Sequence, residues 1–193
     1  MLDSLAIATL VVAALPRTVR AWESQTYAPT SETALFALTN QARAKVGLPS
    51  LRNDTALHTI ARWRSKDMGD RGYFSHQIPP SGAMVFTYMT KRGYCYIYAG
   101  ENIGWSTYPD ETATKVIQQM FMDSATHRAN ILGSKWKTMA IGAYEAENGK
   151  KYWTVLFSIP CSTTTTTTTS NRMSKRKWCK SRRHRLPVYR RWS

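Results

Sequence analysis

Three residues whose side chains suit metal chemistry stand out, although they lie far apart along the chain. His76 follows Phe-Ser, Glu101 lies within Gly-Glu-Asn-Ile, and His127 opens His-Arg-Ala-Asn-Ile-Leu. Neutral imidazole nitrogens and carboxylate oxygens are ligands that a zinc-like ion prefers, and three protein ligands leave one coordination position open for water or substrate. We therefore expect His76, Glu101 and His127 to form one candidate site for a divalent metal.

Further strings surround these residues in a fixed order. They are 39–43 (Thr-Asn-Gln-Ala-Arg), 47–51 (Gly-Leu-Pro-Ser-Leu), 67–68 (Asp-Met), 71–76 (Arg-Gly-Tyr-Phe-Ser-His) and 152–157 (Tyr-Trp-Thr-Val-Leu-Phe). With them, residues 31–161 resemble the CAP superfamily: the cysteine-rich secretory, antigen 5 and pathogenesis-related group one proteins. The likeness is to the bacterial extracellular members with an SCP domain. It implies an α+β fold, a three-layer α-β-α sandwich with a small antiparallel central sheet.

The resemblance also implies a metal tetrad, of which this chain has three members. In CAP relatives, the matching positions and a further acidic residue shortly after the first histidine can hold a divalent metal. Here no Asp or Glu occurs between Gln77 and Gly100. The site would therefore rest on the three residues above, with water or the hydroxyl of Ser75 or Thr126 completing the coordination.

The glutamate has a second interpretation, which bears on function. A Glu101 carboxylate that accepts hydrogen bonds from backbone amides and both imidazoles would hold the cleft together without a metal. As a ligand or an orienting group it leaves no separate general base, and the chain has neither a Gly-x-Ser-x-Gly elbow nor a His-Glu-x-x-His helix. We assign no catalytic residue and no organic cofactor.

These observations favour a binding module over an enzyme. The family resemblance implies a lipid, a sterol or a cell-wall-derived molecule as the ligand of the central cleft. The alternative is a metal-assisted hydrolase of peptides or esters that acts outside the cell.

Most of the positive charge is concentrated at the C-terminal end. The chain has 193 residues and a formal net charge of +15, but residues 171–193 hold ten Lys or Arg and no acid, whereas 22–161 hold fifteen basic and eleven acidic residues. A domain so close to neutral, without groove-reading or aromatic RNA-binding motifs, predicts no specific nucleic-acid partner. The length predicts one domain, which we expect to be monomeric.

The N-terminal residues 1–21 predict export. A mostly apolar run at 5–15 is too short to span a bilayer but suits the core of a secretory signal, and residues 19–21 (Val-Arg-Ala) offer a cleavage region. Asp3 stands where such segments usually carry a positive charge, so the segment also fits a truncated signal or the apolar start of a cytosolic protein. The first interpretation places the protein outside the cell or on its surface.

Two of the three cysteines could support the same location. A Cys95–Cys161 disulfide bond would tie the end of the domain to its middle, and such bonds persist in oxidising compartments. The alternative is two unpaired buried thiols. Cys179 then lies in the tail.

Hydrophobic periodicity predicts four helices, at 32–46, 54–69, 84–92 and from Pro109 onward. The first has an apolar stripe that should face the core: Leu35, Leu38, Ala42 and Val46. Asp54 is a good N-cap for the second, whose apolar face is interrupted by Arg64. We interpret Asp67 and Asp70 as surface charges.

Strands are predicted at 94–99 and 102–105, followed by a C-terminal hairpin. The hairpin pairs 139–145 with 151–159 around Asn148-Gly149, a pair favoured by type I′ turns. The aromatic residues Tyr94, Tyr96, Tyr98 and Trp105 alternate in part. They could form the core and rim of a sheet, or else a face for lipid or carbohydrate.

The chain changes character after Cys161. Seven consecutive threonines in 162–170 predict a linker or stalk, and 171–193 predicts a basic, disordered tail. The tail could instead bind anionic surfaces such as wall polymer or phospholipid head groups. A slipped reading frame at the repetitive tract would also explain the abrupt change in composition.

Overall fold

The computed structural model describes residues 22–161. The predicted secretory signal (1–21), the Thr-rich linker (162–170) and the basic tail (171–193) lie outside these described residues. Within the described part, no helix is both long and apolar enough to cross a membrane.

The four predicted helices are present, and the described residues add a fifth helix and three two-residue strands that periodicity did not predict. The helices are α1 (Pro29–Ala44), α2 (Thr55–Asp70), α3 (Val85–Lys91), α4 (Asp110–Asp123) and α5 (Ala125–Ile131). The strands are β1 (Arg52–Asn53), β2 (Gln77–Ile78), β3 (Ala83–Met84), β4 (Tyr96–Ser106), β5 (Thr138–Glu145) and β6 (Lys151–Pro160). The central sheet has the order β1-β5-β6-β4, while β2 and β3 form a separate small hairpin.

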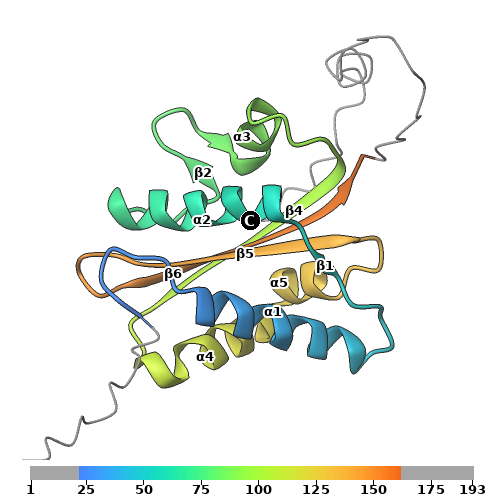
Figure 1. The fold of residues 1–193 in the computed structure, drawn as a ribbon, viewed down its shortest axis with the longest axis horizontal. Coiled ribbons are helices and arrows are strands. Elements are labelled where there is room, and N and C mark those ends of the chain that lie inside the picture. Colours follow the sequence, from blue (N-terminus) through green and yellow to red (C-terminus); the bar gives the residue numbers. More distant parts are fainter. Residues whose placement is uncertain (1–21, 162–193) are drawn as a thin grey trace, which may run out of the picture.

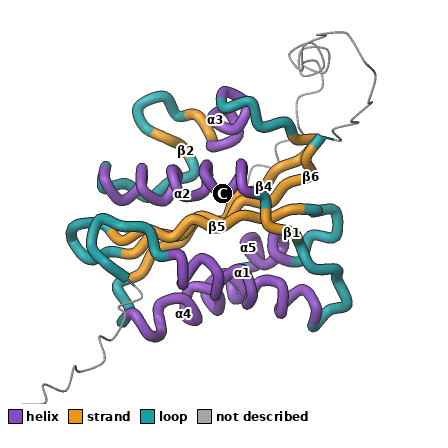
Figure 2. Tube along the Cα trace, viewed as in Figure 1, coloured by secondary structure: helices purple, strands orange, loops and turns teal. Residues whose placement is uncertain are grey.

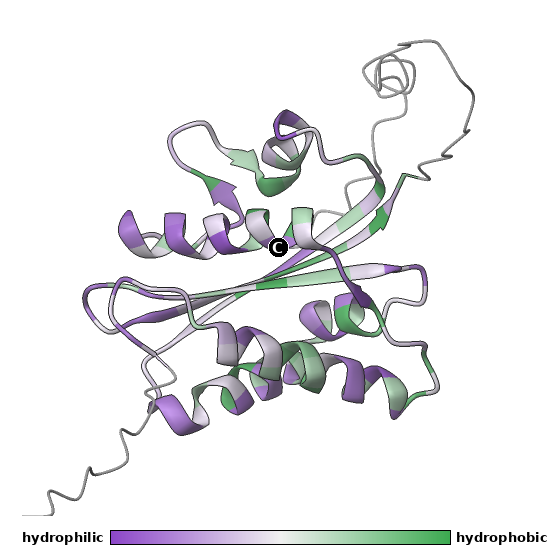
Figure 3. Cartoon of the chain, viewed as in Figure 1, coloured by the Kyte–Doolittle hydropathy of each residue, from purple (hydrophilic) through white to green (hydrophobic). Residues whose placement is uncertain are grey.

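The three-layer sandwich is confirmed. Helices α1, α4 and α5 cover one face of the sheet and α2 and α3 cover the other, as Figure 1 shows and Figure 2 repeats by element type. In Figure 3 the hydrophobic colouring of the strands lies between these helical layers. The sheet differs from the prediction in one respect, because β1 pairs in parallel with β5 while the other pairs are antiparallel.

Helix α2 begins and packs as predicted. The Asp54 side chain accepts a hydrogen bond of 3.1 Å from the backbone N–H of Leu57, so it is the N-cap. The apolar stripe is buried against the sheet, and Arg64 is buried within it. The charged residue that interrupts the stripe therefore lies inside the molecule.

Helix α1 buries a different face from the one predicted. Its buried residues are Ser31, Glu32, Leu35, Thr39 and Arg43. The reason is polar pairing: Thr39 donates to Gln118 Oε1 at 3.1 Å, and Arg43 donates to the carbonyls of Pro49, Ile131 and Gly133. Of the predicted stripe, only Leu35 is fully buried.

The final hairpin is confirmed, but its turn type is not. A type I′ turn needs positive φ at both Asn148 and Gly149, and only Gly149 has it, at 76°. The N–H of Gly149 bonds to the carbonyl of Ala146, and the N–H of Ala146 bonds to the carbonyl of Lys150. The loop therefore has three residues, 147–149, and its last residue, Gly149, has the left-handed backbone conformation that such loops require.

Strand β4 is longer than predicted, because it runs unbroken through Gly100 and Glu101 and unites the two predicted segments. The disulfide bond is confirmed where β4 begins and β6 ends, with the Cα atoms of Cys95 and Cys161 5.4 Å apart. It ties the outer strand of the sheet to its neighbour. Glu101 lies six residues further along β4, where it pairs with Leu156 of β6.

The four alternating aromatic residues divide between the two predicted roles. Tyr94 donates to Asp54, and Tyr96 donates to the carbonyl of Phe86, and both are partly buried. Tyr98 and Trp105 are 46% and 40% exposed. The aromatic residues are therefore partly packing residues and partly surface residues.

Candidate functional site

The three predicted site residues come from three different elements at the β4 edge of the sheet. His76 lies in the loop between α2 and β2, Glu101 lies within β4, and His127 lies in α5. The short helix that contains His127 was not among the four predicted helices. Since β4 is the outer strand of the sheet, residues from both helical layers can approach each other beyond it (Figure 1).

Glu101 is the centre of this cluster. Its Oε2 accepts a hydrogen bond from His76 Nδ1 at 2.7 Å, and its Oε1 accepts one from Arg64 Nε at 3.1 Å. The side chains of Glu101 and Arg64 are 2% and 0% exposed, while that of His76 is 41% exposed. The carboxylate therefore joins a buried cation to an imidazole that faces solvent.

Arg64 extends the cluster away from the cleft. Its Nη1 donates to the hydroxyl of Tyr73 at 2.7 Å, and its Nη2 donates to the backbone carbonyl of Ser75. The Tyr73 hydroxyl in turn donates to Asp67. Burial and this hydrogen bond to Asp67 raise the pKa of Tyr73 to about 12, so the phenol stays protonated as a donor.

The prediction for Asp67 as a surface charge is wrong. Its side chain is only 10% exposed and pairs with Arg71 at 3.0 Å as well as with Tyr73. The sequence contained one indication of this network, the arginine within an apolar helical stripe. A buried arginine needs acceptors for its donors, and periodicity alone does not identify them.

His127 lies on the other side of the cleft. Burial lowers the pKa of its imidazole, and the charge of the nearby His76 lowers it further. Its ring contacts Phe121 edge-on, with ring centroids 5.1 Å apart. The structure thus joins His76 to Glu101 directly, places His127 close enough for the charge of His76 to act on it, and favours a neutral imidazole at His127.

Two asparagines from the same motifs fix α5 against β4. Asn102 donates to the backbone carbonyl of His127 at 3.0 Å, and Asn130 donates to Asn102 Oδ1 at 2.8 Å. Trp136 donates to the carbonyl of Asn130 at 2.8 Å. The Gly-Glu-Asn string therefore positions both histidines, His76 through Glu101 and His127 through Asn102. The His-Arg-Ala-Asn string supplies His127 and, through Asn130, helps to hold Asn102.

The three residues do not fit a three-ligand metal centre as they stand. Both carboxylate oxygens of Glu101 already accept hydrogen bonds, one of them from a guanidinium. Each oxygen keeps a second lone pair, but a metal ion bound there would lie next to the permanent positive charge of Arg64. Across residues 22–161, no group of three or more His, Cys, Asp or Glu side chains is arranged to hold a metal ion.

A concave region lies between α1 and α4, next to α5. It is a groove of about 500 Å³. We call it the α1–α4 groove; its lining residues are Leu38, Gln41, Ala42, Lys45, Val46, Lys115, Gln118, Gln119, Met122 and Leu132. Three members of the predicted core stripe, Leu38, Ala42 and Val46, form its α1 wall. The periodicity therefore identified an apolar face correctly, and this face lines the groove.

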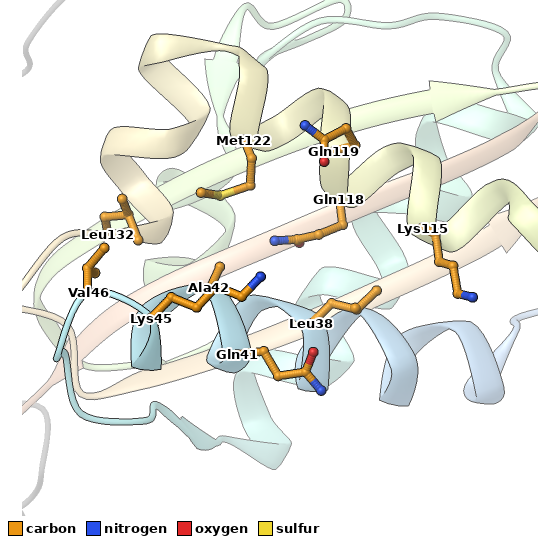
Figure 4. A pocket seen from close by; sticks show the side chains of 10 residues that line it. All are labelled: Leu38, Gln41, Ala42, Lys45, Val46, Lys115, Gln118, Gln119, Met122 and Leu132. Atoms are coloured by element: carbon orange, nitrogen blue, oxygen red, sulfur yellow. The ribbon is translucent and has the colours of Figure 1, made fainter.

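One buried polar group of the groove has no hydrogen-bond partner among the described residues. Gln118 is 8% exposed and its Oε1 accepts from Thr39, but its Nε2 has no hydrogen-bond partner within the described part of the chain. Figure 4 shows Gln118 extending from α4 towards α1, with Lys45 reaching into the same space. None of the ten lining residues is acidic. The groove therefore offers buried and charged donors beside an apolar wall.

Comparison with known proteins agrees with this architecture. The model of the CAP cysteine-rich secretory protein family matches residues 36–157. The chain is 36% identical over 146 residues to the protein YkwD of Bacillus subtilis, in a match that covers 74% of this chain and 54% of YkwD. It therefore spans about half the length of that relative.

Two of the similar solved structures come from bacteria. An extracellular protein containing an SCP domain from Bacillus anthracis is 30% identical with a TM-score of 0.59, over 67% of this chain and 40% of that one. An outer surface protein of Borrelia burgdorferi shares the fold at 14% identity, with a TM-score of 0.62 over 68% of this chain and 94% of its own. With more than half of its residues matched by the family model, the chain belongs to the CAP family of cysteine-rich secretory proteins.

Proposed function

We propose that the protein is an extracellular binding module that captures an apolar molecule with an acidic head group in the α1–α4 groove. The observation that carries the proposal is the unpartnered Nε2 of Gln118, buried beside an apolar wall. A buried donor without an acceptor costs free energy, which a ligand oxygen would recover when the Gln118 side chain turns into the groove. The groove volume of about 500 Å³ is within the range of small-molecule sites.

Charge supports an acidic head group. Lys45 and Lys115 line the groove and no acidic residue does. A carboxylate placed there would receive a charge-assisted hydrogen bond, which is roughly twice as strong as a neutral one. The apolar part of the ligand would cover Leu38, Ala42 and Val46.

An extracellular location is supported by two observations. The Cys95–Cys161 disulfide bond suits an oxidising compartment. The similar Bacillus anthracis protein is described as extracellular. The predicted secretory signal would supply the route, although it lies outside the described residues.

The test is a binding titration of oleic acid against oleyl alcohol, which differ only in the head group. We expect saturable binding of the acid, weaker binding of the alcohol, and loss of acid binding in Lys45→Glu and Ala42→Phe. The matched control is Lys91→Glu, on α3 in the other helical layer, which should bind as the wild type does. Equal binding in all variants, or none to the wild type, would contradict the proposal.

A hydrolase is the second candidate because of one observation at the cleft. Burial lowers the pKa of His127, which leaves a neutral imidazole able to accept a proton at neutral pH. Turnover of a p-nitrophenyl ester that is lost in His127→Ala but retained in Lys45→Glu would favour this candidate over ligand capture.

A further inference from the structure

The cleft already contains a cation of its own. The Arg64 guanidinium contacts Glu101 Oε1 at 3.1 Å, and both side chains are almost fully buried. A guanidinium is a permanent positive charge, and the low dielectric of the interior strengthens its effect on nearby groups. The negative charge of Glu101 is therefore balanced within the protein.

The contacts of Arg64 also fix the residues of the cleft. Nε holds Glu101, Nη1 holds Tyr73, and Nη2 holds the carbonyl of Ser75, the residue that precedes His76. One side chain thus orients both the carboxylate and the backbone that leads to the imidazole. Glu101 then fixes that imidazole through Nδ1.

These contacts disfavour the binding of a divalent ion at Glu101. It would have to share the carboxylate with a guanidinium and the His76 N–H, each of which already donates to one of its oxygens. It would also lie next to a positive charge, and like charges repel strongly in a buried site. The acidic residue that a fourth ligand would need does not occur between Gln77 and Gly100.

We infer that Arg64 takes the place of a divalent metal as the cation of this cleft and makes the Glu101–His76 pair independent of metal. Glu101 is then an orienting partner of His76 rather than a ligand, and Arg64 is a positioning residue. The inference shares no residue with the α1–α4 groove, so it stands or falls separately from the proposed ligand capture.

Zinc titration of the full-length chain by calorimetry tests the inference on the wild type. His184 and Cys179 of the tail are themselves zinc ligand types, so only binding that disappears in His76→Ala is assigned to the cleft. We expect no such component. Stoichiometric zinc binding that depends on His76 would overturn the inference.

Removing the charge of Arg64 should create a zinc site that the wild type lacks. In Arg64→Met the apolar length is kept while the charge is lost, and zinc should bind at a His76-dependent site at least about 10-fold more tightly than to the wild type. Zinc should then raise the melting temperature of this variant and leave that of the wild type unchanged. A merely structural arginine would produce no gain of zinc binding.

The matched control is Arg62→Met, two residues away on α2. It breaks a comparable ion pair, Arg62 with Glu32 at 2.6 Å, outside the cleft, and should gain no zinc binding. A folded Arg64→Met that gains none either would overturn the inference, while folding only in the presence of zinc would support it. If Arg64→Met folds under neither condition, the wild-type titration decides alone.

Discussion

At the scale of single residues, the two histidines of the candidate site have different surroundings. His76 faces solvent and donates to Glu101, whereas His127 is half-buried beside Phe121. Burial, and then the charge of His76, lower the pKa of His127. The lowered pKa has a consequence for stability, because the unfolded chain binds a proton at His127 more readily than the folded one.

Acid should therefore destabilise the protein in part through His127. Stability at this residue is at its full value above the unfolded pKa of about 6.5 and declines as the pH falls below it, because only the unfolded state gains the proton at first. We expect His127→Gln to lose less unfolding free energy than the wild type between about pH 7.5 and about pH 5.5. Urea denaturation at both pH values measures this, and identical losses in the two proteins would refute it.

At the scale of elements, α2 and β5 approach each other closely at Gly142. A Cβ atom added at Gly142 would lie 2.3 Å from the backbone carbon and oxygen of Ala61. The Ser65 hydroxyl also bonds to the carbonyl of Gly142, at 2.9 Å. Glycine at this position lets the helix that carries Arg64 lie directly on the sheet.

Gly142→Ala should consequently separate α2 from the sheet and reduce the free energy of unfolding by about 3 kcal/mol or more. Gly104→Ala is the matched comparison, since its added Cβ would meet the side-chain atom Ile117 Cδ1 at 2.6 Å rather than backbone. A flexible side chain can move, so this variant should lose less. Chemical denaturation compares them, and the reverse order would show that α2 adjusts more easily than its packing suggests.

At the scale of the whole molecule, one covalent bond joins distant parts of the chain. The Cys95–Cys161 disulfide bond connects residues 66 positions apart, at the ends of β4 and β6. In the chain-entropy model, closing a loop of this length stabilises the folded state by about 4 kcal/mol. Much of the molecule, including part of the cleft, lies within the closed loop.

Replacing both cysteines by serine should therefore lower the free energy of unfolding by about 4 kcal/mol. Cys179→Ser is the control and should leave it unchanged, because Cys179 lies outside the bond. Urea denaturation under oxidising conditions gives both values. A double variant as stable as the wild type would mean that the native sheet holds these ends together without the bond.

Local pattern alone predicted the first four helices, most of β4 and the final hairpin, but neither α5 nor the short strands β1, β2 and β3. The cap at Asp54 and the hairpin near Gly149 were predictable because capping and tight turns depend on a few neighbouring residues. The turn type was not, because Asn148 itself does not have positive φ. The family resemblance supplied the layer order and the three cleft residues.

Only the tertiary structure decided what those residues contact. The acceptors of Arg64, at Glu101, Tyr73 and Ser75, lie outside α2, so no spacing within that helix could reveal them. The same is true of α1, where Thr39 pairs with Gln118 in the interior while Leu38, Ala42 and Val46 line a groove, and Ala42 also packs against the core. Sequence periodicity shows that a face is apolar, whereas the partner of that face is set by long-range packing and by where buried polar groups find their hydrogen bonds.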